Sequence, residues 1–131
     1  AAGSPPLPSD LTVDGVNLLQ LLSPSGAPAT PRVIFWRDGH YQAVQTDGWK
    51  LQTAERPKKD WLFNLNDDPT GQKDLAAETP DKVAEFKDLI AKHNATQREP
   101  LFPATGEMPV TIDKTLEEPA TKDDEYIYWP G

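Results

Sequence analysis

Residues 61–94 read WLFNLNDDPTGQKDLAAETPDKVAEFKDLIAKHN, and this stretch decides the fold. Its first five residues alternate around Trp61, Phe63 and Leu65, which is the pattern of a half-buried strand. The sequence NDDP at 66–69 then predicts a turn, because Asn and Asp side chains bond to nearby backbone and proline removes a donor. The stretch therefore begins with a strand that ends in an acidic turn.

A helix is predicted over residues 80–94. Thr79 has the chemistry of an N-cap, and Pro80 suits the first helical position, where a missing N–H costs nothing. Apolar side chains then recur at helical spacing and would form one buried face, with His93 at its edge: Val83, Phe86, Leu89 and Ile90. The whole stretch predicts a strand, a turn and an amphipathic helix.

Three motifs occur in a fixed order along the chain. They are DGVNLL at 14–19, GWKL at 48–51, and the run from LFNL at 62–65 through Asp68-Pro69 and Gly71-Gln72 to DLA at 74–76. In this order they resemble the C-terminal signature of type I sulfatases, the arylsulfatase family of the alkaline phosphatase superfamily. The resemblance covers most of residues 1–97 and weakens after them.

The resemblance implies that the chain is the C-terminal subdomain of a sulfatase-like sulfuric ester hydrolase. Its partner would be an N-terminal catalytic domain, which would use calcium and formylglycine on a sulfate ester; a phosphate or phosphonate ester is the variant within the superfamily. The chain has no cysteine, no serine in the C/S-x-P-x-R context and no Asp-Asn dipeptide. We therefore assign it no catalytic residue, no metal ligand and no cofactor of its own. The alternative is a stand-alone module that binds a protein or a glycan through a Trp-rich sheet.

The predicted fold class is α+β, with a four-stranded antiparallel meander and one main helix packed on one face. Strands are expected at 32–37, 40–46, 49–53 and 61–65, with Asp-Gly turns at 38–39 and 47–48 and an exposed loop at 54–60. Residues 1–30 would lead from the missing catalytic domain, 31–97 would form the sheet-and-helix subdomain, and 98–131 an extended tail. Both ends are rich in proline, which predicts extended arms. Residues 108–112 could add a short edge strand, and the aromatic end at 123–131 is expected to dock on another part of the protein.

The formal net charge is −8 over 131 residues. This acidity argues against non-specific binding to nucleic acid or to an anionic membrane. No apolar run approaches the roughly 20 residues that a membrane span needs. The composition fits the cytoplasm, and it equally fits the periplasm or secretion if the parent carries a signal peptide.

The first predicted hairpin carries the only candidate substrate-binding residues. Trp36, Arg37, His40 and Tyr41 surround its turn, and such tips reach the rim of an active site in many folds. An arginine there could pair with a sulfate oxygen. The competing interpretation is that these residues only pack the hairpin.

The strand at 32–37 is apolar on both faces. Val33 and Phe35 point one way, and Ile34 and Trp36 the other, because side chains alternate along a strand. One helix can cover only one face of the sheet, so a second cover is required. We expect an apolar patch that includes Ile34 or Trp36, with the catalytic domain as its partner.

Overall fold

The computed structural model describes residue 8 and residues 32–99, 101–102, 106–112, 114–115 and 117–130. The chain divides into two units, Ala1–Pro31 and Arg32–Gly131. The DGVNLL motif and the N-terminal proline-rich arm lie outside the described residues. The fold below is that of the second unit.

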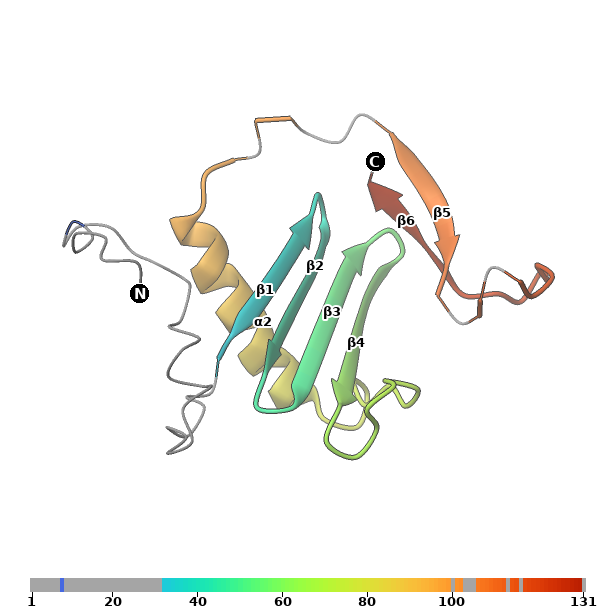
Figure 1. Ribbon diagram of the computed structural model, residues 1–131, viewed down its shortest axis with the longest axis horizontal. Helices are drawn as coiled ribbons and strands as arrows, with labels where there is room; N and C mark the ends of the chain where they lie inside the picture. Colours follow the sequence, from blue (N-terminus) through green and yellow to red (C-terminus); the bar gives the residue numbers. More distant parts are fainter. Residues whose placement is uncertain are drawn as a thin grey trace, which may run out of the picture. The chain divides into compact units, whose positions relative to one another are not determined.

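Four strands form an antiparallel meander in the order β1-β2-β3-β4, as Figure 1 shows. They are β1 (Ile34–Asp38), β2 (Tyr41–Thr46), β3 (Trp49–Glu55) and β4 (Lys58–Asn64). The turn at Asp47 and Gly48 has positive φ at both residues, 49° and 75°. These angles match the twist of the flanking strands, so the Asp-Gly signal predicted this hairpin correctly.

Two other connections differ from the prediction. The β1–β2 turn consists of Gly39 and His40, one residue later than Asp38-Gly39, since Asp38 pairs with Tyr41. The loop expected at 54–60 does not exist: β3 and β4 pair as far as Glu55 and Lys58, and only Arg56 and Pro57 turn, through a cis peptide bond. Pro57 ends the ladder without breaking the strands, because a turn residue needs no ladder hydrogen bond.

The helix α2 (Pro80–Thr96) packs across one face of the sheet, in contact with β2 and β3. Proline occupies its first turn as predicted, but Thr79 makes no side-chain cap. The Thr79 hydroxyl instead donates to the Leu75 carbonyl at 2.9 Å. The four-stranded antiparallel sheet with one helix on it confirms the predicted α+β class for the described residues.

A straight row of side chains from all four strands forms the main core beneath α2. Phe35 is opposite Val44, Val44 opposite Leu51, and Leu51 opposite Leu62, so one residue per strand points at the helix. Phe86 and Ile90 of α2 complete this cluster, and Phe86 is fully buried. The predicted helix face is confirmed, and His93 extends it by stacking on Phe35 at 4.0 Å between ring centroids.

The opposite face of the sheet is partly covered by a hairpin of the C-terminal segment. Strands β5 (Glu107–Thr111) and β6 (Tyr126–Pro130) pair antiparallel as a separate two-stranded sheet. Ile127 packs with Ala54 and Trp61 in a second cluster, which Trp129 borders. The expectation that the aromatic end docks is thus confirmed. The edge strand expected at 108–112 pairs with β6 and not with the meander.

Replacing Phe86 with alanine tests the core. Phe86→Ala should lower the free energy of unfolding by about 3–5 kcal/mol in a denaturant titration, because the side chain is fully buried. Lys92→Ala is the matched control on the exposed face of α2 and should change it by no more than about 0.5 kcal/mol. Equal losses for the two variants would contradict this packing.

Candidate functional site

The β5–β6 hairpin is fixed to the turns of the meander by polar contacts that span many residues of sequence. The Tyr128 N–H donates to the Arg56 carbonyl at 2.8 Å. Glu107 of β5 accepts from Arg56 and also from His40, whose Nε2 lies 3.2 Å from Oε1. Glu107 therefore joins the β1–β2 turn to the β3–β4 turn.

A second acidic side chain, Glu125, faces β4 just before β6 begins. It pairs with Lys59 and accepts from the Trp61 indole N–H at 3.2 Å. The Lys59 ammonium lies 5.1 Å from the centre of the Trp61 ring, which adds a cation–π contact. Glu125 thus satisfies the indole N–H of a tryptophan that is only 6% exposed.

The segment before β6 is held by a third acid–base pair. Asp124 pairs with Lys114, and their side chains are 7% and 12% exposed. The Lys114 ammonium, together with the hydroxyl and backbone N–H of Thr121, lowers the pKa of Asp124 from 3.8 to about 2. The charged carboxylate of Asp124 therefore holds the segment that precedes β6.

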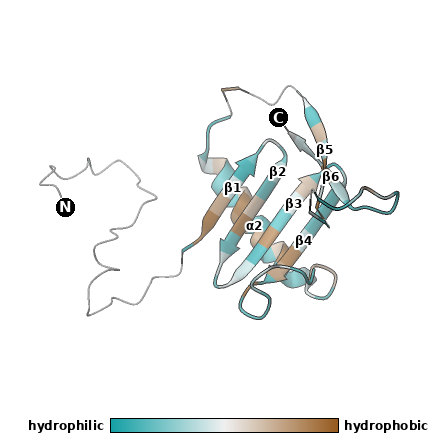
Figure 2. Ribbon diagram, turned by 45° about the vertical axis from the view of Figure 1, so that its right-hand side comes forward, coloured by the Kyte–Doolittle hydropathy of each residue, from teal (hydrophilic) through white to brown (hydrophobic). Residues whose placement is uncertain are grey.

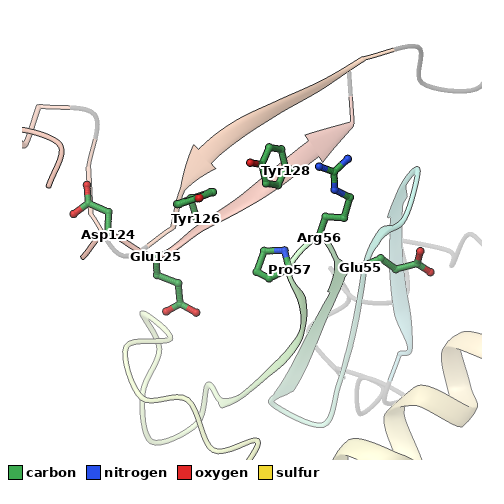
Figure 3. Close-up of a pocket in the computed structure, with 7 residues that line it drawn as sticks. All are labelled: Glu55, Arg56, Pro57, Asp124, Glu125, Tyr126 and Tyr128. Atoms are coloured by element: carbon green, nitrogen blue, oxygen red, sulfur yellow. The ribbon is translucent and has the colours of Figure 1, made fainter. Parts of the chain in front are cut away.

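A pocket of about 400 Å³ opens where this segment meets the β3–β4 turn. Figure 3 shows that Arg56 and Pro57 approach it from the meander and that Tyr126 and Tyr128 approach from β6. The Arg56 guanidinium already lies 4.5 Å from the Tyr128 ring centre. The cation-binding face of that ring is therefore occupied by the protein itself.

A larger groove of about 780 Å³ lies over the second face of the sheet. Its floor holds three aromatic side chains, Tyr41, Trp61 and Phe63, and its walls carry amides and charged groups. Burial raises the pKa of the Tyr41 phenol, and a hydrogen bond from Gln52 offsets part of this rise. An aromatic floor with amide walls is chemically suited to a polar, ring-shaped ligand such as a sugar.

The four predicted substrate-binding residues do not converge on one site. Trp36 and Tyr41 lie on the hairpin's outer face, whereas Arg37 is on the face of α2, where it approaches Glu99 at 3.9 Å. His40 lies in the turn against Glu107. Only Tyr41 of the four lines the groove, so contact with a substrate stays a prediction for all of them.

The residues that carry the family resemblance build the connection from β4 to α2. Asp68 accepts from the N–H groups of Gln72 and Lys73, at 2.5 and 2.8 Å, and these bonds lower its pKa. Asp74 accepts from the N–H groups of Leu62 and Ala76, at 3.0 and 2.9 Å. Both carboxylates therefore hold the backbone, and for Asp68 this is the role that the sequence indicated for the acidic turn.

The polar contacts of the hairpin were missed at the sequence level. Glu107 and Glu125 bond to residues 51 to 67 positions away, and no local pattern marks such partners. One signal was present, because residues 126–129 read YIYW, and aromatic and β-branched residues are enriched in strands. In the structure Ile127 is buried, whereas Tyr126 is 44% exposed.

Within the described residues, no group of three or more His, Cys, Asp or Glu side chains is arranged to hold a metal ion. No helix in this part of the chain is long and apolar enough to cross a membrane. The chain matches no model of a known protein family and no curated protein.

The low pKa of Asp124 predicts how acid affects the C-terminal segment. A carboxyl group whose pKa falls on folding contributes stability above its unfolded pKa, and this contribution is lost as the pH falls through the folded value. Asp124→Asn should therefore destabilise the protein at pH 6, and the difference from wild type should shrink between about pH 4 and pH 2. Denaturant titrations of both proteins across this range measure it. A difference that does not change with pH would contradict the assignment.

Proposed function

We propose that this chain is the non-catalytic C-terminal portion of a sulfatase-like hydrolase of sulfuric esters, and that it completes and stabilises a catalytic domain. The order of the three sequence motifs is the first support. Two of these motifs lie in the described residues, and in the fold they occupy the β2–β3 hairpin and the β4–α2 connection.

The observation that carries the proposal is that the motif residues build the fold. Gly48 adopts φ of +75°, and Leu51 and Leu62 are fully buried in the main core. Asp68 and Asp74 are committed to backbone N–H groups. We therefore assign these motifs to a subdomain that supports an active site located elsewhere.

A pair of adjacent apolar side chains supports the need for a partner. Leu101 and Phe102 follow α2 and are 89% and 91% exposed. Large neighbouring apolar groups in water are unfavourable, and a covering protein surface removes this cost. We assign this pair to the contact with the catalytic domain, which would also bring the calcium ion, the formylglycine and the sulfate ester site.

The sequence encoded upstream of Ala1 is the direct test. It should contain a C/S-x-P-x-R motif and Asp-Asp and Asp-Asn pairs. The longer polypeptide should hydrolyse an aryl sulfate with calcium, whereas the purified 131-residue chain should release no product. Calcium-dependent turnover by the 131-residue chain alone, or an upstream sequence without the motif, would overturn the proposal.

A double variant at Leu101 and Phe102 tests the proposed contact with the catalytic domain. Leu101→Ser combined with Phe102→Ser should weaken binding between this chain and the separately expressed catalytic domain by at least about tenfold, because each exposed apolar anchor contributes on the order of 1 kcal/mol or more. Isothermal titration calorimetry measures the affinity. Met108→Ser is the matched control, since Met108 is 67% exposed and lies on the hairpin. Equal weakening by the control would show that the contact is not located at residues 101–102.

The groove over the second face favours one alternative function, a module that binds glycans. Its aromatic floor and its amides Gln52 and Gln72 suit a saccharide. The tryptophans support this alternative poorly, because Trp36 alone of the four is exposed and Trp61 is buried. Millimolar binding of sulfated or neutral oligosaccharides to the 131-residue chain, weakened by Gln72→Ala, would favour the module.

A further inference from the structure

Strand β1 ends the meander, and one of its edges is unpaired in the part of the chain that the structure describes. In the described part of the chain, β1 pairs with β2 alone, in an unbroken register of five residues. Edge strands usually carry a lysine, a proline or a bulge that prevents pairing with another chain. The centre of β1, Ile34-Phe35-Trp36, has none of these.

The side chains around this edge are apolar and accessible. Val33, Ile34 and Trp36 are 44%, 38% and 48% exposed. Figure 2 shows the hydrophobic colour at the beginning of β1. Charge occurs only toward the ends, at Arg32, Arg37 and Asp38. An apolar centre with charged ends is the arrangement of a pairing strand that has a defined register.

We infer that β1 pairs antiparallel with β1 of a second copy of this chain, with the two-fold axis at Phe35. An antiparallel pair about a perpendicular two-fold axis keeps side chains on their own faces, so residue i meets residue 70 − i of the other copy. Arg32 then lies opposite Asp38, and Ile34 lies opposite Trp36. The two four-stranded sheets join into one, with both α2 helices on the same side.

The charges select this register over its neighbours. With the axis at Phe35, both ends of the pair bring Arg32 of one copy to Asp38 of the other. With the axis at Trp36, Asp38 would meet Ile34 and Arg37 would meet Phe35, so no opposite charges would pair. Cross-strand pairs of opposite charge and of aromatic with β-branched residues stabilise a sheet, and like charges opposite each other destabilise it.

This inference does not depend on the proposed function. Pairing uses the backbone edge of β1, so the outer face of Ile34 and Trp36 stays accessible to a catalytic domain. The two contacts can therefore be tested separately, the edge by self-association of the 131-residue chain and the domain contact by Leu101 and Phe102.

Single charge reversals and their mixture test the register. Asp38→Arg places two arginines opposite each other, and Arg32→Asp places two aspartates, so each variant alone should dimerise at least about tenfold more weakly than wild type. An equimolar mixture of the two should recover a heterodimer of near wild-type affinity, because each pair is again of opposite charge. Sedimentation equilibrium of the full 131-residue chains measures all three.

Matched controls change the same charges elsewhere. Asp123→Arg and Lys122→Asp reverse the charge of exposed residues in the C-terminal segment, and they should leave the dissociation constant of the dimer within about threefold of wild type. Circular dichroism verifies that every variant is folded.

A Trp36→Lys variant, which places a lysine at the centre of the edge, should be monomeric. A monomeric wild-type chain at millimolar concentration, or variants that self-associate like wild type, or a mixture that fails to form heterodimers, would overturn the inference.

Discussion

The structure depends on burying a sheet that is apolar on both faces. On one face, Phe35, Val44, Leu51 and Leu62 form a row that the helix α2 covers through Phe86. On the other face, Trp61 and Ala54 need a separate cover, which is Ile127 of the C-terminal hairpin. The C-terminal segment is therefore part of the folded unit. This unit still leaves large apolar side chains exposed, among them Leu101 and Phe102.

Local signals in the sequence were sufficient for the meander and the helix. The Asp-Gly pair at 47–48 specifies a turn with positive φ, and the spacing of Val83, Phe86 and Ile90 specifies the buried face of α2. The error at 54–60 concerns competition between a turn signal and the pairing of adjacent strands. Pro57 and its basic neighbours indicated a loop at 54–60, yet Glu55 pairs with Lys58 and the loop contracts to two residues.

The candidate site was much less accessible to prediction. Tyr41 lines the groove, whereas Arg37 points to the face of α2, because neighbouring residues of a strand face opposite sides. Trp36 shares the outer face with Tyr41 but does not line the groove, and His40 lies in the turn against Glu107. The partners of His40 and Lys59, Glu107 and Glu125, lie 67 and 66 residues further along the chain. These contacts form because the hairpin docks on the meander, and no periodicity in the sequence indicates that docking.

The way in which the hairpin is attached has a consequence for folding. The meander and α2 are built from neighbouring segments, whereas the hairpin is joined through contacts across long stretches of chain. Closing long loops costs entropy before any contact compensates for it, so such pairings form late. Half-exposed ion pairs such as Arg56–Glu107 and Lys59–Glu125 contribute little to holding the hairpin on the meander, about 0–1 kcal/mol of stability each. The hairpin should therefore be the last element to assemble and the first to open, and its amide hydrogens should exchange with solvent sooner than those of β2 and β3.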